Sequence, residues 1–395
     1  MITFGEAVTL TAALARPLGR EQVALAEAHG RVLAAPVIAR IASPRADVST
    51  MDGYAVRDAD LAALPARLRI VGQSFPGADH ACALEPGECV RIFTGAPVPP
   101  GADRVVIQEN VRRDGEIAVF ETPPSTVRFI RHTASDFAVG DELLPAGVRL
   151  GPRQLVAAGA ADVGTLSVWR LPRIVVLSTG DELAEPGTAR DQTGRIPDSI
   201  SAGVAALAEE YGAQVIRQAT LGDDLAELER AADLALREAD VVVVTGGASV
   251  GERDFAQAMF AGHGLEPVFT EVAIKPGKPV WLARSGSRIV LGLPGNPTSA
   301  MVTARLFLAP LVTGLAGRDP AATLRWRQMC LAGPVGPVGD RETFARGVAE
   351  AGAVRLLPNQ DSGVQKALAE CGLLVRLRAG APAIAAGESV DVLDF

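Results

Sequence analysis

Hydrophobic residues recur along this chain with different spacings, and each spacing predicts a different kind of structure. Near the N-terminus they follow helical intervals over Phe4–Leu14, and Thr3 and Glu6 have the spacing of a capping box, so we expect a helix there. Over residues 38 to about 140, short apolar runs alternate with Pro and Gly turns. That alternation is typical of a small all-β unit.

After Pro172 the apolar residues form short continuous runs separated by helical stretches. The runs Ile174–Leu177, Val241–Val244 and Ile289–Leu293 are expected of strands buried on both faces of a parallel sheet. Strands that alternate with helices favour a doubly wound sheet, whose sites lie beyond the carboxyl ends of its strands. From about residue 321 the chain returns to β texture, which predicts a small C-terminal barrel.

The patterns together predict a multidomain α/β plus β architecture, because a chain of 395 residues exceeds what a single core holds. We expect a central doubly wound α/β domain, a connecting region, an inserted small β domain and a C-terminal β-barrel-like domain. Their expected limits, in that order, are residues 1–19 with 170–320, 20–38 with 141–169, 39–140, and 321–395.

Charge and cysteine usage narrow the class of protein. A formal net charge of -8 argues against general affinity for nucleic acid. The first ten residues carry Glu6 and no basic segment, so no signal peptide is expected. The apolar stretch around Phe307 is interrupted by Arg305 and Pro310, which argues against a membrane span. The four cysteines show no CxxC spacing, so we expect reduced, structural thiols and a cytoplasmic protein.

Three glycine-rich turns follow the predicted strands. Backbone N–H groups beside a helix start suit an anion such as a phosphate. Each turn alone has an ordinary structural explanation, and none matches a P-loop or a dinucleotide fingerprint. Three of them at consecutive strand ends favour a binding site. The turns are Ser178-Thr179-Gly180-Asp181-Glu182, Thr245-Gly246-Gly247-Ala248-Ser249-Val250-Gly251 and Pro294-Gly295-Asn296-Pro297.

Several charged residues near these turns have two interpretations. Asp181, Asp224 and Asp254 each could cap a helix, whereas several acids beside phosphates would need a divalent cation such as Mg²⁺. Three of the 38 basic residues are lysines, and two of these, Lys275 and Lys278, share one Pro-Gly turn. A lysine in such a turn is ordinarily a solvated surface charge. The scarcity of lysine favours a specific role for the pair.

Two polar turns stand out in the β unit, at Ser49–Val56 and Phe93–Pro97. Either could be a hairpin turn and nothing more. From the residues alone, the chain is an anion-binding α/β protein with a set of carboxylates able to hold a metal ion.

These residues carry a resemblance that extends over essentially the full length. The chain resembles the molybdopterin molybdenumtransferases, the bacterial MoeA proteins related to the E domain of gephyrin. Six motifs in order, correctly spaced, make the resemblance specific. They are Ser49–Val56 (STMDGYAV), Thr94–Glu109 (TGAPVPPGADRVVIQE), Ser178–Leu183 (STGDEL), Thr245–Asp254 (TGGASVGERD), Lys275–Pro279 (KPGKP) and Leu293–Ala300 (LPGNPTSA).

The resemblance implies that molybdate displaces AMP from adenylylated molybdopterin in a Mg²⁺-dependent step. It also implies a homodimer whose active cleft lies between the α/β domain of one subunit and the β domain of the other. The molybdopterin adenylyltransferase and apo-molybdoenzymes become candidate protein partners. By position, the implied catalytic residues are Asp52, Thr94, Arg131, Asp136, Lys275 and Lys278, and the implied metal ligands are Glu182, Asp223 and Asp254. The implied substrate-binding residues are Ser178, Thr179, Gly180, Gly246, Gly247, Ser249, Gly251, Pro294, Gly295 and Asn296.

The sequence departs from the family pattern at three places. The segment from Arg131 to Asp136 lacks two basic residues and one acid, Ile200 replaces an asparagine, and Glu271 occupies a position that is commonly basic. Fewer cations would weaken the capture of a dianion. The alternative is therefore a diverged, non-catalytic molybdopterin-binding or carrier paralogue. A scaffold protein and a hydrolase of pyrophosphate-linked nucleotides are weaker alternatives, and molybdate or tungstate preference stays open.

Overall fold

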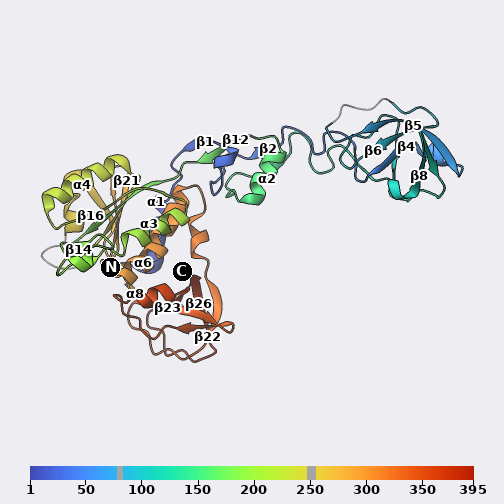
Figure 1. The fold of residues 1–395 in the computed structure, drawn as a ribbon. Coiled ribbons are helices and arrows are strands. Elements are labelled where there is room, and N and C mark those ends of the chain that lie inside the picture. The colour runs from blue at the N-terminus through green and yellow to red at the C-terminus, as the bar shows by residue number, and fades with distance from the viewer. Residues whose placement is uncertain (78–82, 247–254) are drawn as a thin grey trace.

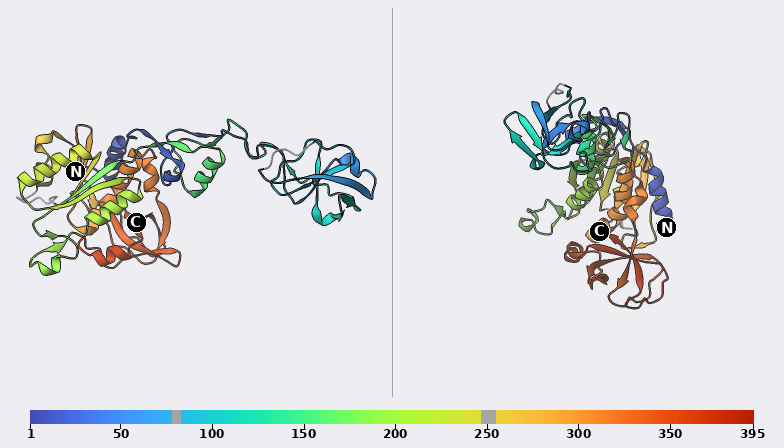
Figure 2. Two further views of the ribbon diagram at one scale, coloured as in Figure 1. Left: turned by 45° about the horizontal axis from the view of Figure 1, so that its top comes forward. Right: turned by 90° about the vertical axis from the view of Figure 1, so that its right-hand side faces the viewer.

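The computed structural model describes residues 1–77, 83–246 and 255–395 of an elongated molecule (Figure 1). One end holds the α/β sheet with the C-terminal barrel beside it, and the other end holds the β unit. A thin connecting region joins the two ends, and the views in Figure 2 agree with this arrangement.

The α/β end is built on a six-stranded mixed sheet. Its order is β16-β13-β17-β21-β20-β18; the first four strands are parallel, and β20 and β18 each run antiparallel to the preceding neighbour. The predicted strands are all present. The bounds are β13 Arg173–Thr179, β16 Gln214–Leu221, β17 Val241–Thr245, β18 Leu265–Phe269, β20 Trp281–Ser285 and β21 Arg288–Leu293.

Helices cover both faces of this sheet, because successive side chains of a strand point to opposite sides. Val176 and Val243 pack with α1, α3, α6 and α7, whereas Val175 and Val242 pack with α4 and α5. The doubly wound prediction is thus confirmed. The helix bounds are α1 Phe4–Leu14, α3 Ser201–Glu210, α4 Leu225–Glu238, α5 Phe255–Ala258, α6 Pro297–Thr303 and α7 Ala309–Leu315.

Two predicted helix starts have the expected caps. Thr3 and Glu6 form a complete capping box at the start of α1. Asp224 caps α4, since its Oδ1 accepts a hydrogen bond of 2.8 Å from the amide of Glu227.

The helices α6 and α7 are joined through a π-helical turn, Ala304–Leu308, into one apolar run. Among the described residues, this run (Pro297–Leu315) is the one helix long and apolar enough to cross a membrane, and 94% of it is buried inside the protein. A helix that is apolar all round and buried in this way is a core helix. Arg305 lies within it and donates to the carbonyl oxygens of Thr323 and Asp394, each at 2.9 Å.

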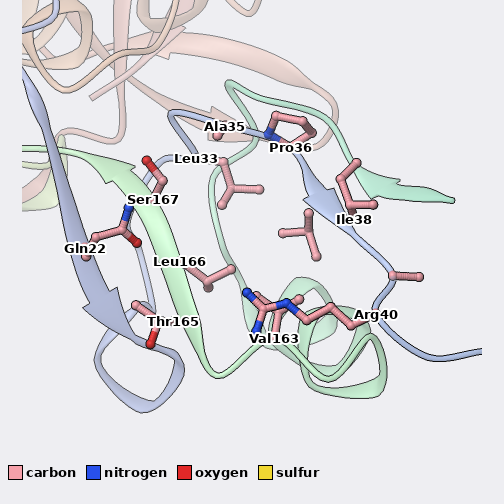
Figure 3. Close-up of a pocket in the computed structure, with 12 residues that line it drawn as sticks. Gln22, Leu33, Ala35, Pro36, Ile38, Arg40, Val163, Thr165, Leu166 and Ser167 are labelled. Atoms are coloured by element: carbon pink, nitrogen blue, oxygen red, sulfur yellow. The ribbon is translucent and has the colours of Figure 1, made fainter. Parts of the chain in front are cut away.

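The chain crosses the connecting region twice. The outgoing and returning segments pair as β1 (Arg20–Ala24) with β12 (Thr165–Trp169) and as β2 (Val37–Ile38) with β11 (Glu142–Leu144). A helix, α2 (Pro152–Ala160), packs here although the sequence pattern did not predict it. A cavity of about 310 Å³ lies in this region. Figure 3 shows its lining, which is mostly apolar, with polar side chains from Gln22, Arg40, Thr165 and Ser167.

The β unit contains the six-stranded sheet β7-β4-β6-β5-β9-β8 and the short pair β3 and β10. Among the described strands of this sheet, β5 and β6 form the one parallel pair, and the other neighbours pair antiparallel. The bounds are β3 Val48–Ser49, β4 Gly53–Val56, β5 Ala66–Ser74, β6 Glu88–Ile92, β7 Arg104–Ile107, β8 Val111–Asp114, β9 Ile117–Phe120 and β10 Ile130–Arg131.

The C-terminal strands close into a barrel, as predicted. β23 pairs with both β24 and β25, so the order β23-β24-β22-β26-β25 returns to its start, and β19 adds to β23. The bounds are β19 Ile274–Lys275, β22 Arg327–Leu331, β23 Glu342–Glu350, β24 Ala353–Leu356, α8 Gln365–Glu370, β25 Leu373–Leu377 and β26 Ser389–Asp394. The short strands β14 (Leu183–Ala184) and β15 (Ile196–Pro197) pair beside the α/β sheet.

Candidate functional site

The three glycine-rich turns begin side by side at one edge of the α/β sheet, and Thr245 and Gly246 are the described residues of the second turn. In the parallel ladders Ser178 is paired with Thr245, and Thr245 with Leu293, so β13, β17 and β21 end at the same level. Sites in doubly wound sheets form beyond this edge. The expectation that the three turns form one surface therefore agrees with the register of the strands.

Close backbone contact between two of the turns explains one of the glycines. Gly246 has φ +91°, and a Cβ there would lie 2.3 Å from the carbonyl oxygen of Thr179. A side chain at Gly246 would therefore push the first and second turns apart. The third turn lies in ordinary contact with them, since a Cβ on Gly295 would lie 3.4 Å from the Cα of Gly246.

A buried network of hydroxyl groups lies beneath the turns. Ser178 Oγ is 2.5 Å from Ser201 Oγ and 2.7 Å from Thr245 Oγ1. Asp198 closes the network, because its Oδ2 accepts from Ser201 Oγ at 2.6 Å and from Thr220 Oγ1 at 3.0 Å. A cavity of about 550 Å³ is lined by Asp198, Ser201 and Thr220.

Asp198 was not among the predicted site residues. Burial by itself would raise its pKa, but hydrogen bonds from the side chain and amide of Ser201 outweigh burial and hold the pKa below its usual value. Asp198 therefore stays ionised and fixes the hydroxyl groups of the network. The available signal was its place two residues before Ile200, in the segment that departs from the family pattern.

Two of the acidic residues after β13 and β16 face each other. The amide of Asp223 donates to Asp181 Oδ1 at 3.0 Å, and the amide of Asp181 approaches Asp223 Oδ2 at 3.4 Å. The carboxylate of Glu182 lies over Gly180, where a Cβ would come within 2.6 Å of Glu182 Oε2. Asp181 is therefore hydrogen-bonded to the turn after β16. The short strand β14 follows it and no helix does, so the prediction that Asp181 caps a helix is wrong.

The predicted metal ligands are described in part. Glu182 and Asp223 lie at this edge, whereas Asp254 falls outside the described residues, as do Gly247, Ser249 and Gly251. Within the described ranges, no group of three or more His, Cys, Asp or Glu side chains is placed to hold a metal ion. The oxygen ligands that are present are of the hard type that Mg²⁺ prefers.

Lys275 and Lys278 have different environments. Lys275 is exposed at the end of β19, and no carboxylate of the described chain lies within 4.0 Å of its ammonium group. Lys278 Nζ lies 3.2 Å from Glu271 Oε1, and both side chains are more than a third exposed. The intervening Gly277 packs on α6, because a Cβ there would lie 2.3 Å from a methyl group of Thr303. Lys275 therefore offers the less compensated positive charge.

At the other end of the molecule, Asp52 and Thr94 are joined across two turns. The amide and the hydroxyl of Thr94 donate to Asp52 Oδ1 at 2.8 and 2.9 Å. The amide contributes most to lowering the pKa of Asp52 below its usual value. Both bonds go to Oδ1, and among the described residues no hydrogen bond reaches Oδ2, so this oxygen can accept from a ligand.

The segment from Arg131 to Asp136 lies near that pair through β3 and β10. Arg131 and Asp136 are both exposed. The segment is held by Asp47, whose Oδ1 accepts from the amide of Thr133 at 2.8 Å and whose Oδ2 is 2.9 Å from His132 Nδ1. The amide of Thr133 contributes most to lowering the pKa of Asp47. Asp47 was missed because an isolated aspartate in a polar loop has no distinguishing spacing.

The predicted residues thus form two groups that do not meet within one chain. Asp52, Thr94, Arg131 and Asp136 belong to the β unit around β4, β6 and β10. The turns, the acids and Lys275 belong to the α/β end around β16 and β21. Figure 1 places these two ends at opposite extremes of the molecule.

Comparison with known families gives matches to both ends. The model described as "MoeA N-terminal region (domain I and II)" matches residues 2–164. The model described as "Probable molybdopterin binding domain" matches residues 175–314, which include the three turns.

Individual relatives cover most of the chain. It is 36% identical over 304 residues to the molybdopterin molybdenumtransferase of Nostoc sp., covering 75% of this chain and 70% of that protein. The enzyme of the same name from Synechococcus elongatus is 33% identical over 385 residues, covering 95% and 94%. A solved structure, the molybdopterin biosynthesis MoeA protein from Pyrococcus horikosii, superposes with a TM-score of 0.86 at 27% identity, over 100% of this chain and 99% of that one.

Proposed function

The chain belongs to the family of molybdopterin molybdenumtransferases, and on this premise we propose that it inserts molybdenum from molybdate into adenylylated molybdopterin and releases AMP. The observation that supports this activity most is the set of three adjoining turns at the sheet edge, with Lys275 in a turn that packs on α6. Backbone N–H groups and an ammonium group are suited to anions such as molybdate and the phosphates of the substrate.

Each group of residues has a proposed role. The turns bind the pterin and its phosphate through Gly246, Asn296 and their neighbours. Ser178, which was predicted to bind substrate, is fully buried and supports the turns from below. Lys275 attracts molybdate and offsets the charge that develops as AMP leaves. Glu182 and Asp223, with Asp254, would hold Mg²⁺, which would neutralise phosphate charge when bound. Asp198 positions the hydroxyl groups beneath the turns through its bonds to Ser201 and Thr220.

The active site is proposed to be shared between two copies of the chain. Asp52 and Thr94 lie at the opposite end of the molecule from Lys275, so one chain cannot bring them together (Figure 1). In a twofold-symmetric dimer, the β unit of each copy can reach the α/β end of the other, which gives two equivalent sites. Arg131 and Asp136 would then line the same crevice from the β unit.

Release of AMP tests the activity. The purified protein is mixed with adenylylated molybdopterin, Mg²⁺ and molybdate, and AMP is measured by chromatography. We expect release that depends on molybdate and that falls strongly in Lys275→Ala. No release from the wild-type protein would refute the proposed activity.

Mixing two inactive variants tests the shared site. Asp52→Asn and Lys275→Ala homodimers should each be impaired, but a heterodimer of the two contains one site with both residues intact. It should therefore recover about half of the wild-type rate, since one of its two symmetric sites is complete. A mixture that stays as slow as its components, although subunit exchange is demonstrated, would contradict the shared site.

A second candidate function is supported by the ion pair of Lys278 with Glu271. This pair reduces the positive charge available for molybdate, which would suit a molybdopterin-binding carrier that has lost transfer activity. Such a carrier would bind molybdopterin tightly and release no AMP when molybdate is added. The substitution Glu271→Lys would then raise AMP release.

We also propose a cytoplasmic location and functional contact with a molybdopterin adenylyltransferase and with apo-molybdoenzymes. The division into residues 1–19 with 170–320, 20–38 with 141–169, 39–140 and 321–395 is proposed as the set of domains. Pull-down of the tagged protein with purified candidate partners would test the contacts, and limited proteolysis would test the domain limits.

A further inference from the structure

Next to the Asp52–Thr94 pair, the β unit carries a column of stacked planar groups. The guanidinium of Arg91 lies over the ring of Tyr54 at 5.2 Å and over the ring of Phe93 at 4.7 Å. Phe93 in turn stacks on Phe75, with ring centroids 4.5 Å apart and planes within 10°. Tyr54, Arg91 and Phe93 are at most partly exposed, and Phe75 ends the column.

The outer ring of the column is open to solvent. Phe75 is 47% exposed, although Phe is a residue that proteins usually bury. Within the part of the chain that the structure describes, its ring has a ring contact with Phe93 and with no other aromatic residue. A parallel stack with a free end is a surface on which a further flat ring can lie.

Hydrogen bonds hold this open ring in place. The amide of Phe93 donates to the carbonyl oxygen of Ser74 at 3.2 Å, and Ser74 Oγ donates to the carbonyl oxygen of Pro97 at 2.8 Å. The same turn carries Thr94, which is bonded to Asp52. The exposed ring and the anionic acceptor are therefore connected through one hydrogen-bonded turn.

We propose that Phe75 is the stacking platform for the adenine ring of the adenylylated substrate. The proposal rests on the function proposed above, and it adds a binding role for the β unit. The substrate has two flat ring systems, and the family model for molybdopterin binding covers residues 175–314, at the other end of the chain. The ring that remains for the β unit is adenine, whose amino group can donate to a carboxylate such as Asp52. Any nucleobase can stack on an aromatic side chain, because every base has a flat π-face, and such stacking is a general mode of base binding.

Binding of AMP tests the platform without any turnover. A Phe75→Trp variant places an indole in the column, and its fluorescence is compared with that of the wild-type protein, which contains Trp169, Trp281 and Trp326. With Mg²⁺ present, AMP should quench the added signal in a saturable manner, and molybdopterin should not. Absence of quenching by AMP, or quenching by molybdopterin alone, would overturn the assignment.

Kinetics distinguish a binding role from a structural one. Phe75→Ala should raise the KM for adenylylated molybdopterin by about tenfold, the size expected from loss of one base stack, while kcat and the KM for molybdate change little. Phe75→Trp should restore the KM. Leu234→Ala, which removes an equally exposed apolar side chain from α4, should match the wild type.

The outcomes separate the two proposals. If the wild-type protein releases AMP and Phe75→Ala has an unchanged KM, the platform is refuted and the transfer activity stands. If the wild-type protein releases no AMP, the transfer activity is refuted, and the fluorescence titration still decides whether Phe75 binds adenine.

Discussion

Replacing Arg346 by lysine should loosen the barrel next to the proposed substrate site. Arg346 lies on β23 and is 1% exposed, the largest of the fully buried side chains. Its Nη1 donates to Thr298 Oγ1 at 3.0 Å, and its Nη2 donates to the carbonyl oxygens of Asn359 and Asp361 at 3.2 and 3.0 Å. These bonds join the barrel, the loop 359–364 and α6, which begins at the third glycine-rich turn.

The expected loss of stability in Arg346→Lys follows from the number of buried oxygen acceptors that would lose their hydrogen-bond donor. Burial lowers the pKa of Arg346, and its hydrogen-bond acceptors within the described chain are neutral oxygens, which solvate its charge. A lysine ammonium is a compact donor and cannot reproduce the planar fork. Leaving two buried acceptors unpaired, at about 1–3 kcal/mol each, gives a loss of about 3 kcal/mol.

Hydrogen exchange measured by mass spectrometry reports this loss of stability for individual segments of the chain. Amides of β23 (Glu342–Glu350) should exchange about 100-fold faster in Arg346→Lys, because each 1.4 kcal/mol corresponds to a factor of about ten. Amides of β17 should be unchanged and serve as an internal reference.

The matched control is Arg355→Lys on the neighbouring strand β24. Arg355 is half-exposed and pairs with Glu350 at 2.6 Å, and exposed pairs of this kind contribute about 1 kcal/mol or less. Equal protection of β23 in Arg346→Lys and in Arg355→Lys would refute the reasoning.

Three further predictions concern groups outside the site. Asp240 accepts from both terminal nitrogens of Arg170; burial would raise its pKa, but Arg170, the amide of Arg173 and the charge of Arg288 together outweigh burial and lower it. Asp240→Asn should therefore reduce the unfolding free energy in urea by roughly 2 kcal/mol at pH 7, and the difference should begin to shrink as the pH falls below about 4, the ordinary pKa of aspartate, and be lost once the pH falls through the lower folded-state pKa. A difference that does not shrink in acid, while the protein is still folded, would contradict this. Gly292→Ala should lower the Tm in calorimetry by several degrees or more, because its Cβ would lie 2.0 Å from the Trp281 ring; an unchanged Tm would refute the packing. Burial raises the pKa of Cys89 to about 12, so iodoacetamide at pH 8 should label exposed Cys330 and leave Cys89 unmodified in peptide mass spectra. Equal labelling of the two thiols would contradict the burial of Cys89.

The sequence predicted the parts of the fold that depend on neighbouring residues. The capping box at Thr3 and the cap at Asp224 are local hydrogen bonds, and the valine run of β17 is a local pattern of burial. The grouping of the three turns was also predictable, because parallel strands end at one edge of a sheet. The helix α2 was missed because Gly151 and Pro152 are also typical of turns, whereas Pro at a first helical position is favourable.

The missed residues depend on contacts between distant segments. Arg346 is buried because the barrel closes over the loop 359–364, and an arginine on a β-strand is more often solvated. Asp198 gains its role from Ser178 and Thr220, each about twenty positions away. The positions of Asp52 and Lys275 at opposite ends depend on the length of the connecting region, which apolar periodicity does not report.

The double crossing of the connecting region has a mechanical consequence. The two segments brace each other through β1 with β12 and β2 with β11, so the region forms a strut that is stiffer than a single linker would be. Because the β unit lies far from the sheet, a slight rotation of this region at the sheet end displaces the β unit, with Asp52 and Phe75, over a much larger distance. In the proposed dimer, such a rotation would widen or narrow the crevice between the two copies while every side chain keeps its own local geometry.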